Sequence, residues 1–186
     1  MKLYWRHGFD GTTTARLAAE MGITPPSLYA AFGSKEGLFR EALDLYSRKN
    51  GGFITESFAE GGTIRAQIAR MMRKAAHQFS QEDGCRGCMI ATGELHAAPD
   101  TSAMAHLLKS LRMNALDAIL ARLGEARQTG ELPAGANILA LATFFAATIQ
   151  GMAVQARDGA AEDLLEALAD LSMKAWPGRI EDCEAP

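Results

Sequence analysis

The stretch from Gly8 to Phe39 limits most strongly what this 186-residue chain can fold into. The three threonines at positions 12–14 offer hydroxyl groups at the start of a short apolar helix, where side-chain oxygens accept hydrogen bonds from free backbone N–H groups. Gly22 is expected to end this helix, because glycine adopts the left-handed conformation without steric cost. The stretch therefore begins with one short helix that has a start signal and a stop signal.

A second short helix follows at once. Thr24 is a suitable N-cap and Pro25 suits the first helical position, where no backbone N–H is needed. Gly33 ends this helix, and Ser34 caps a third. Two short helices joined by a tight glycine turn indicate a helix-turn-helix, whose second helix places its N-terminal residues at base edges in the major groove. The helix starts on either side present N–H groups to backbone phosphates.

The same residues carry a family resemblance. The run G-F-x-G-T-T-x-x-x-L-A-x-x-x-G-I-T-x-x-S-L-Y-x-x-F-x-S-K-E-x-L, about the first quarter of the chain, resembles the DNA-binding domain of the TetR/AcrR family of bacterial transcriptional regulators. The resemblance implies that Pro25, Pro26 and Ser27, behind the cap Thr24, face the bases. It implies phosphate contacts from four further residues: Thr13, Thr14, Tyr29 and Lys35.

Composition and charge agree with a helical, DNA-binding chain. Alanine and leucine dominate and β-branched residues are sparse, which favours helix. Residues 1–49 carry seven Lys and Arg against five Asp and Glu, whereas the whole chain has a net charge of −3. No stretch is expected to span a membrane, and the N-terminus lacks a signal-peptide pattern, so we expect a cytoplasmic protein. Three cysteines, an odd number, do not indicate a secreted disulfide framework.

The pattern predicts an all-α chain of about nine helices, the first of which is short and ends at Gly8. We expect a helix-turn-helix DNA-binding domain over residues 1–48, a larger ligand-binding and dimerisation domain over 49–178, and a mobile tail over 179–186. Family members usually have a longer first helix, which leaves two alternatives: this helix is short, or the native N-terminus is longer.

The segment from Asn137 to about Gln155 is apolar nearly all round, so it must be buried on more than one side. We infer a subunit interface, and the amphipathic segment from Ala160 to Trp176 follows it. The family resemblance implies that the last two long helices pair with their mates in a four-helix dimer interface. Two reading helices in such a homodimer recognise a palindromic operator with half-sites roughly 34–36 Å apart. The expected interface residues are Phe144, Ile149, Leu164, Leu168 and Leu171.

The apolar middle of the chain, residues 63–155, is where a pocket for a small effector would lie. Methionine suits an adaptable pocket because its side chain is flexible and polarisable. Core packing is the alternative reading of every one of these side chains. The candidate ligand-binding residues are Met71, Phe79, Met89, Met104, Met113, Phe144, Phe145 and Met152.

Cys85 and Cys88 have the C-x-x-C spacing of a redox pair or half of a metal site. No second such pair accompanies them, so we expect no metal and no cofactor, and thiol sensing remains an alternative. Glu94 and His96 point to different faces of a helix, and no catalytic set appears, so we expect no enzyme. The sequence favours a homodimeric repressor that binds double-stranded DNA and is released by a small, largely apolar ligand. The alternatives are a thiol-responsive sensor and a helical dimerisation module with weak DNA binding.

Overall fold

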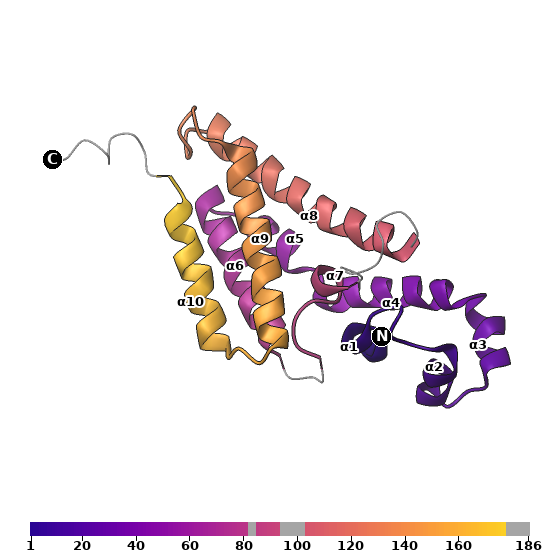
Figure 1. Ribbon diagram of the computed structural model, residues 1–186. Coiled ribbons are helices and arrows are strands. Elements are labelled where there is room, and N and C mark those ends of the chain that lie inside the picture. Colours follow the sequence, from indigo (N-terminus) through magenta and orange to yellow (C-terminus); the bar gives the residue numbers. More distant parts are fainter. Residues whose placement is uncertain (82–84, 94–102, 178–186) are drawn as a thin grey trace.

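A computed structural model of the protein describes residues 1–81, 85–93 and 103–177, and all secondary structure in this part is helical (Figure 1). The predicted all-α class is confirmed, including the short first helix. The predicted tail 179–186 lies outside the described residues. The elements are α1 (Lys2–His7), α2 (Thr14–Met21), α3 (Pro25–Phe32), α4 (Lys35–Asn50), α5 (Phe53–Ala59), α6 (Ile64–Ser80), α7 (Met89–Thr92), α8 (Ala103–Gln128), α9 (Ile138–Arg157), α10 (Glu162–Ser172) and a 3-10 turn at Met173–Ala175.

The starts of α2, α3 and α4 follow from their capping residues. The hydroxyl of Thr13 accepts a hydrogen bond from the backbone N–H three residues on, at 3.2 Å. Thr24 and Ser34 do the same at 3.3 Å and 3.0 Å. Each such cap contributes about 1 kcal/mol. Gly22 ends α2 with φ of 68°, in the left-handed region that glycine adopts without strain.

An aromatic cluster joins α1 to the start of α4. The ring of Tyr4 meets that of Phe39 edge-on with centroids 4.9 Å apart, and Phe9 meets Phe39 at 5.2 Å. The Tyr4 hydroxyl donates a hydrogen bond to the backbone oxygen of Lys35 at 3.1 Å. Although α1 has only six residues, these contacts fix it against the helix that follows the helix-turn-helix.

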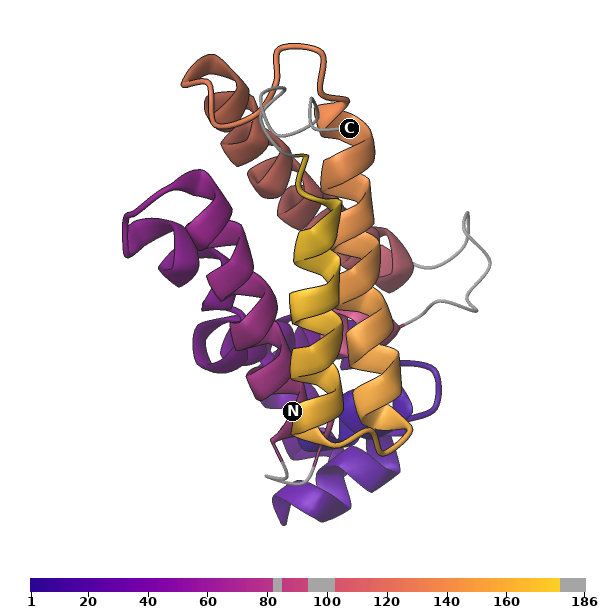
Figure 2. The same cartoon turned by 90° about the vertical axis from the view of Figure 1, so that its left-hand side faces the viewer.

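The larger part of the chain is a helical bundle centred on α6. Helix α6 packs against α5, α8, α9 and α10, and α9 also packs against α8 and α10. Figure 2 shows α9 and α10 side by side on one outer face of the bundle, and Figure 1 places α2 and α3 at the opposite end of the molecule. The short α7 lies at the junction and contacts α1, α4, α8 and α9.

Helix α9 corrects one expectation. By length and composition alone, this one helix of the described residues is long and apolar enough to cross a membrane, whereas the sequence was expected to contain no such stretch. Its inner face, with Phe145 and Met152, is buried in the bundle. A core helix of a bundle passes the same test of length and composition, because burial among other helices also favours apolar residues.

Candidate nucleic-acid interface and internal cavity

The N-terminal end of α3 is an exposed, mostly apolar surface. Thr24, Pro25, Pro26 and Ser27 are all exposed, while Leu28 is fully buried and anchors the helix on its inner side. The hydroxyls of Ser27 and Thr24 lie 2.9 Å apart and hydrogen-bond to each other. The two hydroxyls are therefore the polar groups that this end of the helix offers to base edges, and they occupy one another.

The residues expected to contact phosphates lie on α3 itself and at the starts of α2 and α4, both of which contact α3 (Figure 1). Thr13 is exposed and Thr14 half-buried at the start of α2, and Tyr29 on α3 is 46% exposed. The ammonium group of Lys35 lies 4.1 Å above the centre of the Phe9 ring. This cation–π contact holds the charge at the start of α4, where it adds to the positive helix end.

A cavity of about 220 Å³ lies where α4, α5, α7, α8 and α9 meet, and α6 contributes Phe79 to its wall. It exceeds the roughly 150 Å³ of a dry apolar cavity that admits benzene. Most of its wall is apolar, and its polar groups come from Tyr46, Cys88, Arg112 and Gln150, with Ser47 at the end of α4. Its apolar lining consists of Gly51, Phe53, Ile54, Phe79, Ile90, Ala91, Leu111, Ala115, Ile119, Ala146 and Ile149.

Of the eight candidate ligand-binding residues, Phe79 lines this cavity. Met113 and Phe144 are exposed, at 45% and 42%. The remaining five fill the core of the bundle, because flexible methionines and a large aromatic ring close the irregular gaps between packed helices. Those five buried residues are Met71, Met89, Met104, Phe145 and Met152.

The residues that sequence reasoning missed are the polar ones in the wall. Arg112 had a signal, since it is a charged residue inside the apolar stripe of α8, beside Leu108 and Leu111. Tyr46 carries no such signal, since it follows Ala42 and Leu43 on the apolar face of α4. Its role in the cavity depends on how α4 meets α7, which local sequence does not reveal.

Cys88 and Tyr46 form a buried pair in the cavity wall. The Tyr46 hydroxyl donates a hydrogen bond to the Cys88 sulfur at 3.2 Å, and the backbone N–H of Ala91 donates to the same sulfur at 3.4 Å. Burial raises the pKa of both the Cys88 thiol and the Tyr46 phenol. Both groups therefore stay uncharged near neutral pH.

The C-x-x-C pair is not joined by a disulfide. Cys85 and Cys88 are both free, and the Cys85 thiol points to the backbone oxygen of Lys2, at 3.6 Å. Within residues 1–81, 85–93 and 103–177, no group of three His, Cys, Asp or Glu side chains could hold a metal ion. Glu94 and His96 lie outside the described residues.

Arg112 enters the cavity without an acidic partner among the described residues. Its guanidinium donates hydrogen bonds to the backbone oxygens of Ile90, at 2.9 Å, and Gly93, at 3.5 Å. Burial lowers its pKa, yet a guanidinium remains charged in proteins. Two carbonyl oxygens compensate part of this charge, and the rest has no described counter-ion.

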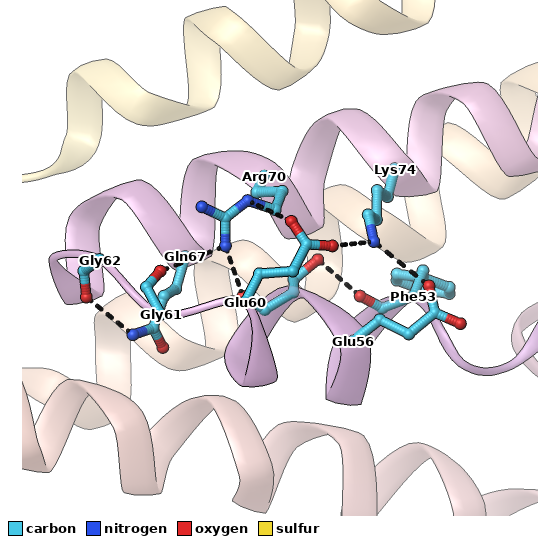
Figure 3. Close-up of polar contacts among 9 residues, drawn as sticks. Phe53, Glu56, Glu60, Gly61, Gly62, Gln67, Arg70 and Lys74 are labelled. Carbon is cyan, nitrogen blue, oxygen red and sulfur yellow. Dashed lines mark hydrogen bonds and ion pairs between the residues drawn. The ribbon is translucent and has the colours of Figure 1, made fainter.

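Polar contacts hold α5, one wall of the cavity, against α6 (Figure 3). Lys74 donates to Glu56 at 3.2 Å and to Glu60 at 2.6 Å. Arg70 pairs with Glu60 at 3.0 Å and donates to the backbone oxygen of Ser57 at 2.9 Å. Since α5 supplies Phe53 and Ile54 to the cavity, this network fixes that wall to the rigid bundle.

Helices α9 and α10 lie side by side on one outer face of the bundle (Figure 2), and both expose large apolar side chains. On α9, Leu139, Phe144 and Val154 are 56%, 42% and 40% exposed. On α10, Leu164 and Leu171 are 52% and 54% exposed. The other two expected interface residues lie differently: Leu168 is half-buried, and Ile149 is buried in its own subunit and lines the cavity.

Comparison with known proteins gives the geometry a context. A sequence model described as "Bacterial regulatory proteins, tetR family" matches residues 1–42. The HTH-type transcriptional repressor ComR of Escherichia coli (strain K12) is 33% identical over 182 residues, which are 97% of this chain and 87% of ComR. The HTH-type transcriptional repressor BdcR of the same organism is 36% identical over 91 residues, covering 49% of this chain and 46% of BdcR.

Among solved structures, a cysteine-substituted form of the TetR family transcriptional regulator CifR is similar along nearly its whole length. It is complexed with 26-base-pair double-stranded operator DNA. The two chains share 33% identity with a TM-score of 0.88, over 95% of this chain and 92% of CifR. A TetR transcriptional regulator from Rhodococcus sp. RHA1 is 34% identical with a TM-score of 0.65, over 95% of this chain and 94% of that one.

Proposed function

Because the chain belongs to the TetR family of bacterial transcriptional regulators, we propose that it is a cytoplasmic repressor that binds a palindromic operator as a homodimer and is released by a small, largely apolar ligand. Members of this family are DNA-binding transcription factors and not enzymes, so the chain is a DNA-binding regulator. The repressor role is supported by two relatives named as repressors. The homodimer and the ligand are supported by the surfaces and the cavity described above.

The reading surface supports recognition that depends largely on DNA shape and on phosphate contacts. Pro25 and Pro26 offer apolar contact to thymine methyl groups, but no bidentate hydrogen bonds. The hydroxyls of Thr24 and Ser27 are short and already paired with each other. Phosphate contacts from Thr13, Thr14, Tyr29 and Lys35 would fix the orientation of α3 in the groove, and sequence-dependent DNA deformability would add selectivity.

The exposed apolar side chains of α9 and α10 support the homodimer. Contiguous exposed apolar surface of this kind usually marks an interaction site. Pairing α9 and α10 with the same helices of a second subunit would form a four-helix interface about a two-fold axis. Leu164 and Leu171 would then be buried by the partner, together with Phe144 on α9.

Tyr46 carries the proposed link between ligand and DNA. It lies near the C-terminal end of α4, in the cavity wall, while the N-terminal end of α4 carries Lys35 and follows directly on α3. Its ring also meets Trp5 of α1 edge-on, with centroids 4.8 Å apart. A ligand that displaces Tyr46 would therefore move both α4 and α1, and with them the spacing of the two reading helices. The size of this effect equals the difference in ligand affinity between the two arrangements.

Two outcomes of one binding assay test the DNA-binding part of this proposal. Fluorescence anisotropy would follow the protein on fragments of its own upstream DNA at two salt concentrations. We expect saturable binding to one palindromic fragment, with two subunits per site and an affinity that falls steeply with salt, as phosphate contacts require. Absence of binding at low salt would sink the proposal and favour a dimerisation module.

The thiol-responsive alternative is tested by the same assay after mild oxidation. The buried, hydrogen-bonded and uncharged Cys88 is a poor nucleophile, because thiolate is the reactive form. We therefore expect the variants Cys85→Ser and Cys88→Ser to respond to oxidation as the parent does. An oxidative loss of operator binding that both serine variants abolish would establish a thiol switch instead.

A further inference from the structure

The cavity contains one charged side chain, and its position is informative about the ligand. We propose that the effector is an amphiphilic organic anion of the carboxylate class, whose acid group pairs with the Arg112 guanidinium while its apolar part occupies the space lined by Phe79, Ile119 and Ile149. This inference rests on the proposed function in one respect, namely that the cavity is the effector site.

The positive charge of Arg112 has no described counter-ion. Its guanidinium lines the cavity and donates to two backbone oxygens, but no described Asp or Glu pairs with it. A half-buried cation with only carbonyl partners is incompletely compensated, because carbonyl dipoles replace water without supplying a counter-charge. An anion in the cavity would supply the missing charge, and the planar fork of arginine matches the two oxygens of a carboxylate.

The packing of α8 does not require an arginine at position 112. The neighbouring positions on α8 are filled by Leu111, Ala115 and Ile119, and each of them lines the same cavity. Another arginine of this helix, Arg122, has side-chain partners, since it donates to the Gln67 side chain at 2.7 Å and pairs with Glu125. Arg112 has no comparable side-chain partner in the part of the chain that the structure describes.

A second hollow, of about 200 Å³, lies between α8 and α9 at the surface of the molecule. It shares Arg112, Ala146 and Gln150 with the cavity, so the two spaces adjoin at these residues. Lys109 lines this outer hollow, and no described Asp or Glu lines either space. A ligand that approaches between α8 and α9 therefore meets two positive charges in succession, an arrangement that attracts anions.

The other residues of the cavity wall limit the charge and the size of the ligand. The polar groups of Tyr46 and Cys88 are uncharged and already hydrogen-bonded to each other, so they do not call for a second charge. The volume of about 220 Å³ admits a ligand larger than benzene. A monoacid with a short chain or a single substituted ring fits both observations.

The test is direct ligand binding to the full-length protein without DNA, measured by isothermal titration calorimetry. The probes are octanoate and 4-isopropylbenzoate, each compared with its primary amide, which has the same shape and no charge. We expect each acid to bind at least about tenfold more tightly than its amide, a difference of about 1.4 kcal/mol, because hydrogen bonds between two charged groups are stronger than those to a neutral amide. Arg112→Gln should reduce this ratio to about one.

Two further variants separate charge from folding. Arg127→Gln removes an exposed cation near the C-terminal end of α8, outside both spaces, and should keep the acid preference of the wild type. Arg112→Lys restores the charge and should recover part of it, with melting temperatures confirming that all variants fold. Equal affinity for acid and amide in the wild type, no binding of either acid, or an acid preference that survives in Arg112→Gln would each overturn the proposal. The proposed function fails by a different result, loss of operator binding by the ligand-free wild type.

Discussion

The two ends of this molecule differ in how their working surfaces are built. The reading end is made of consecutive residues, and each of its helices begins at a capping hydroxyl in the same short stretch, such as Thr13 and Ser34. The cavity is lined by residues of six helices, α4 to α9, which extend from Tyr46 to Gln150 in the sequence. Local sequence signals therefore determine the DNA-reading surface, whereas the cavity forms only when the helices of the bundle pack together.

The largest expected effect comes from a glycine at the reading end. A Cβ atom at Gly37 would lie 2.1 Å from the backbone oxygen of Phe32, so the turn between α3 and α4 would have to distort. We expect Gly37→Ala to destabilise the protein by about 3 kcal/mol or more, as strain at a fixed backbone position does, and to lose operator binding. Thermal unfolding followed by circular dichroism would measure the loss.

Gly124 provides the matched control for that substitution. It lies in α8, and a Cβ atom there would meet nothing within 4 Å. Gly124→Ala should be neutral or stabilise the helix by roughly 0.5–1 kcal/mol. Equal stability of the two alanine variants would contradict the tight α3–α4 turn.

The next largest effect concerns the proposed dimer interface on α9 and α10, at the cavity end of the molecule. The double substitution Leu164→Glu and Leu171→Glu places two carboxylates on the exposed face of α10. We expect a monomer at micromolar concentration, because buried interface side chains commonly contribute about 2 kcal/mol or more each, with operator affinity falling at least about 100-fold. Sedimentation velocity would measure the mass.

The control is Met21→Glu, which places a carboxylate on a side chain of α2 that is 42% exposed. This variant should remain dimeric. If the α10 variant also sediments as a dimer, α9 and α10 do not form the interface.

Two tyrosines allow a smaller and sharper comparison of the two ends. Tyr46→Phe removes the hydrogen bond to the Cys88 sulfur and should cost about 1 kcal/mol of unfolding free energy. Tyr29→Phe removes an exposed hydroxyl and should leave stability within about 0.5 kcal/mol, while operator affinity falls several-fold. Urea unfolding would measure the stability of both variants, and fluorescence anisotropy would measure their operator affinity. A loss of stability in Tyr29→Phe would place its hydroxyl in the fold rather than on the DNA.

The smallest effect is the pH dependence of the network between α5 and α6. Hydrogen bonding from Lys74 lowers the pKa of Glu60 below its ordinary value of 4.5. Because the folded pKa is the lower one, the pair contributes stability above pH 4.5 and loses it as pH falls through the folded pKa. We expect Glu60→Gln to flatten the decline in melting temperature between pH 5 and 3. An unchanged decline would show that the exposed pairs contribute nothing measurable.

The same contrast explains what the sequence alone could predict. Caps and glycine stops act within four residues, so the starts of α2, α3 and α4 followed from the threonines at 12–14, Thr24 and Ser34. The ends of α2 and α3 followed from Gly22 and Gly33. The cavity wall did not follow, because the flexibility of methionine suggested Met71 and Met104 as pocket residues, and the structure places both in the core. Which apolar residue faces a void depends on the crossing of α8 and α9, and this is a property of packing.

Arg112 shows where sequence reasoning could have gone further. A charged residue inside an apolar helical stripe must either reach solvent or find a partner, so its position was a detectable signal. The partner's absence among the described residues became apparent only from the structure. The exposed leucines of α10, by contrast, lie on the amphipathic helix that the sequence predicted.

The account depends most on the claim that an occupied cavity weakens operator binding, and this can be tested without knowing the ligand. Ala115 lines the cavity on α8, and Ala115→Phe would fill it from within. Ala121→Phe, at an exposed position on the same helix, is the control. Anisotropy on the operator fragment should show at least about tenfold weaker binding for Ala115→Phe, a change of about 1.4 kcal/mol, with the dimer retained and wild-type affinity in the control. A folded, dimeric Ala115→Phe variant with wild-type operator affinity would contradict the account.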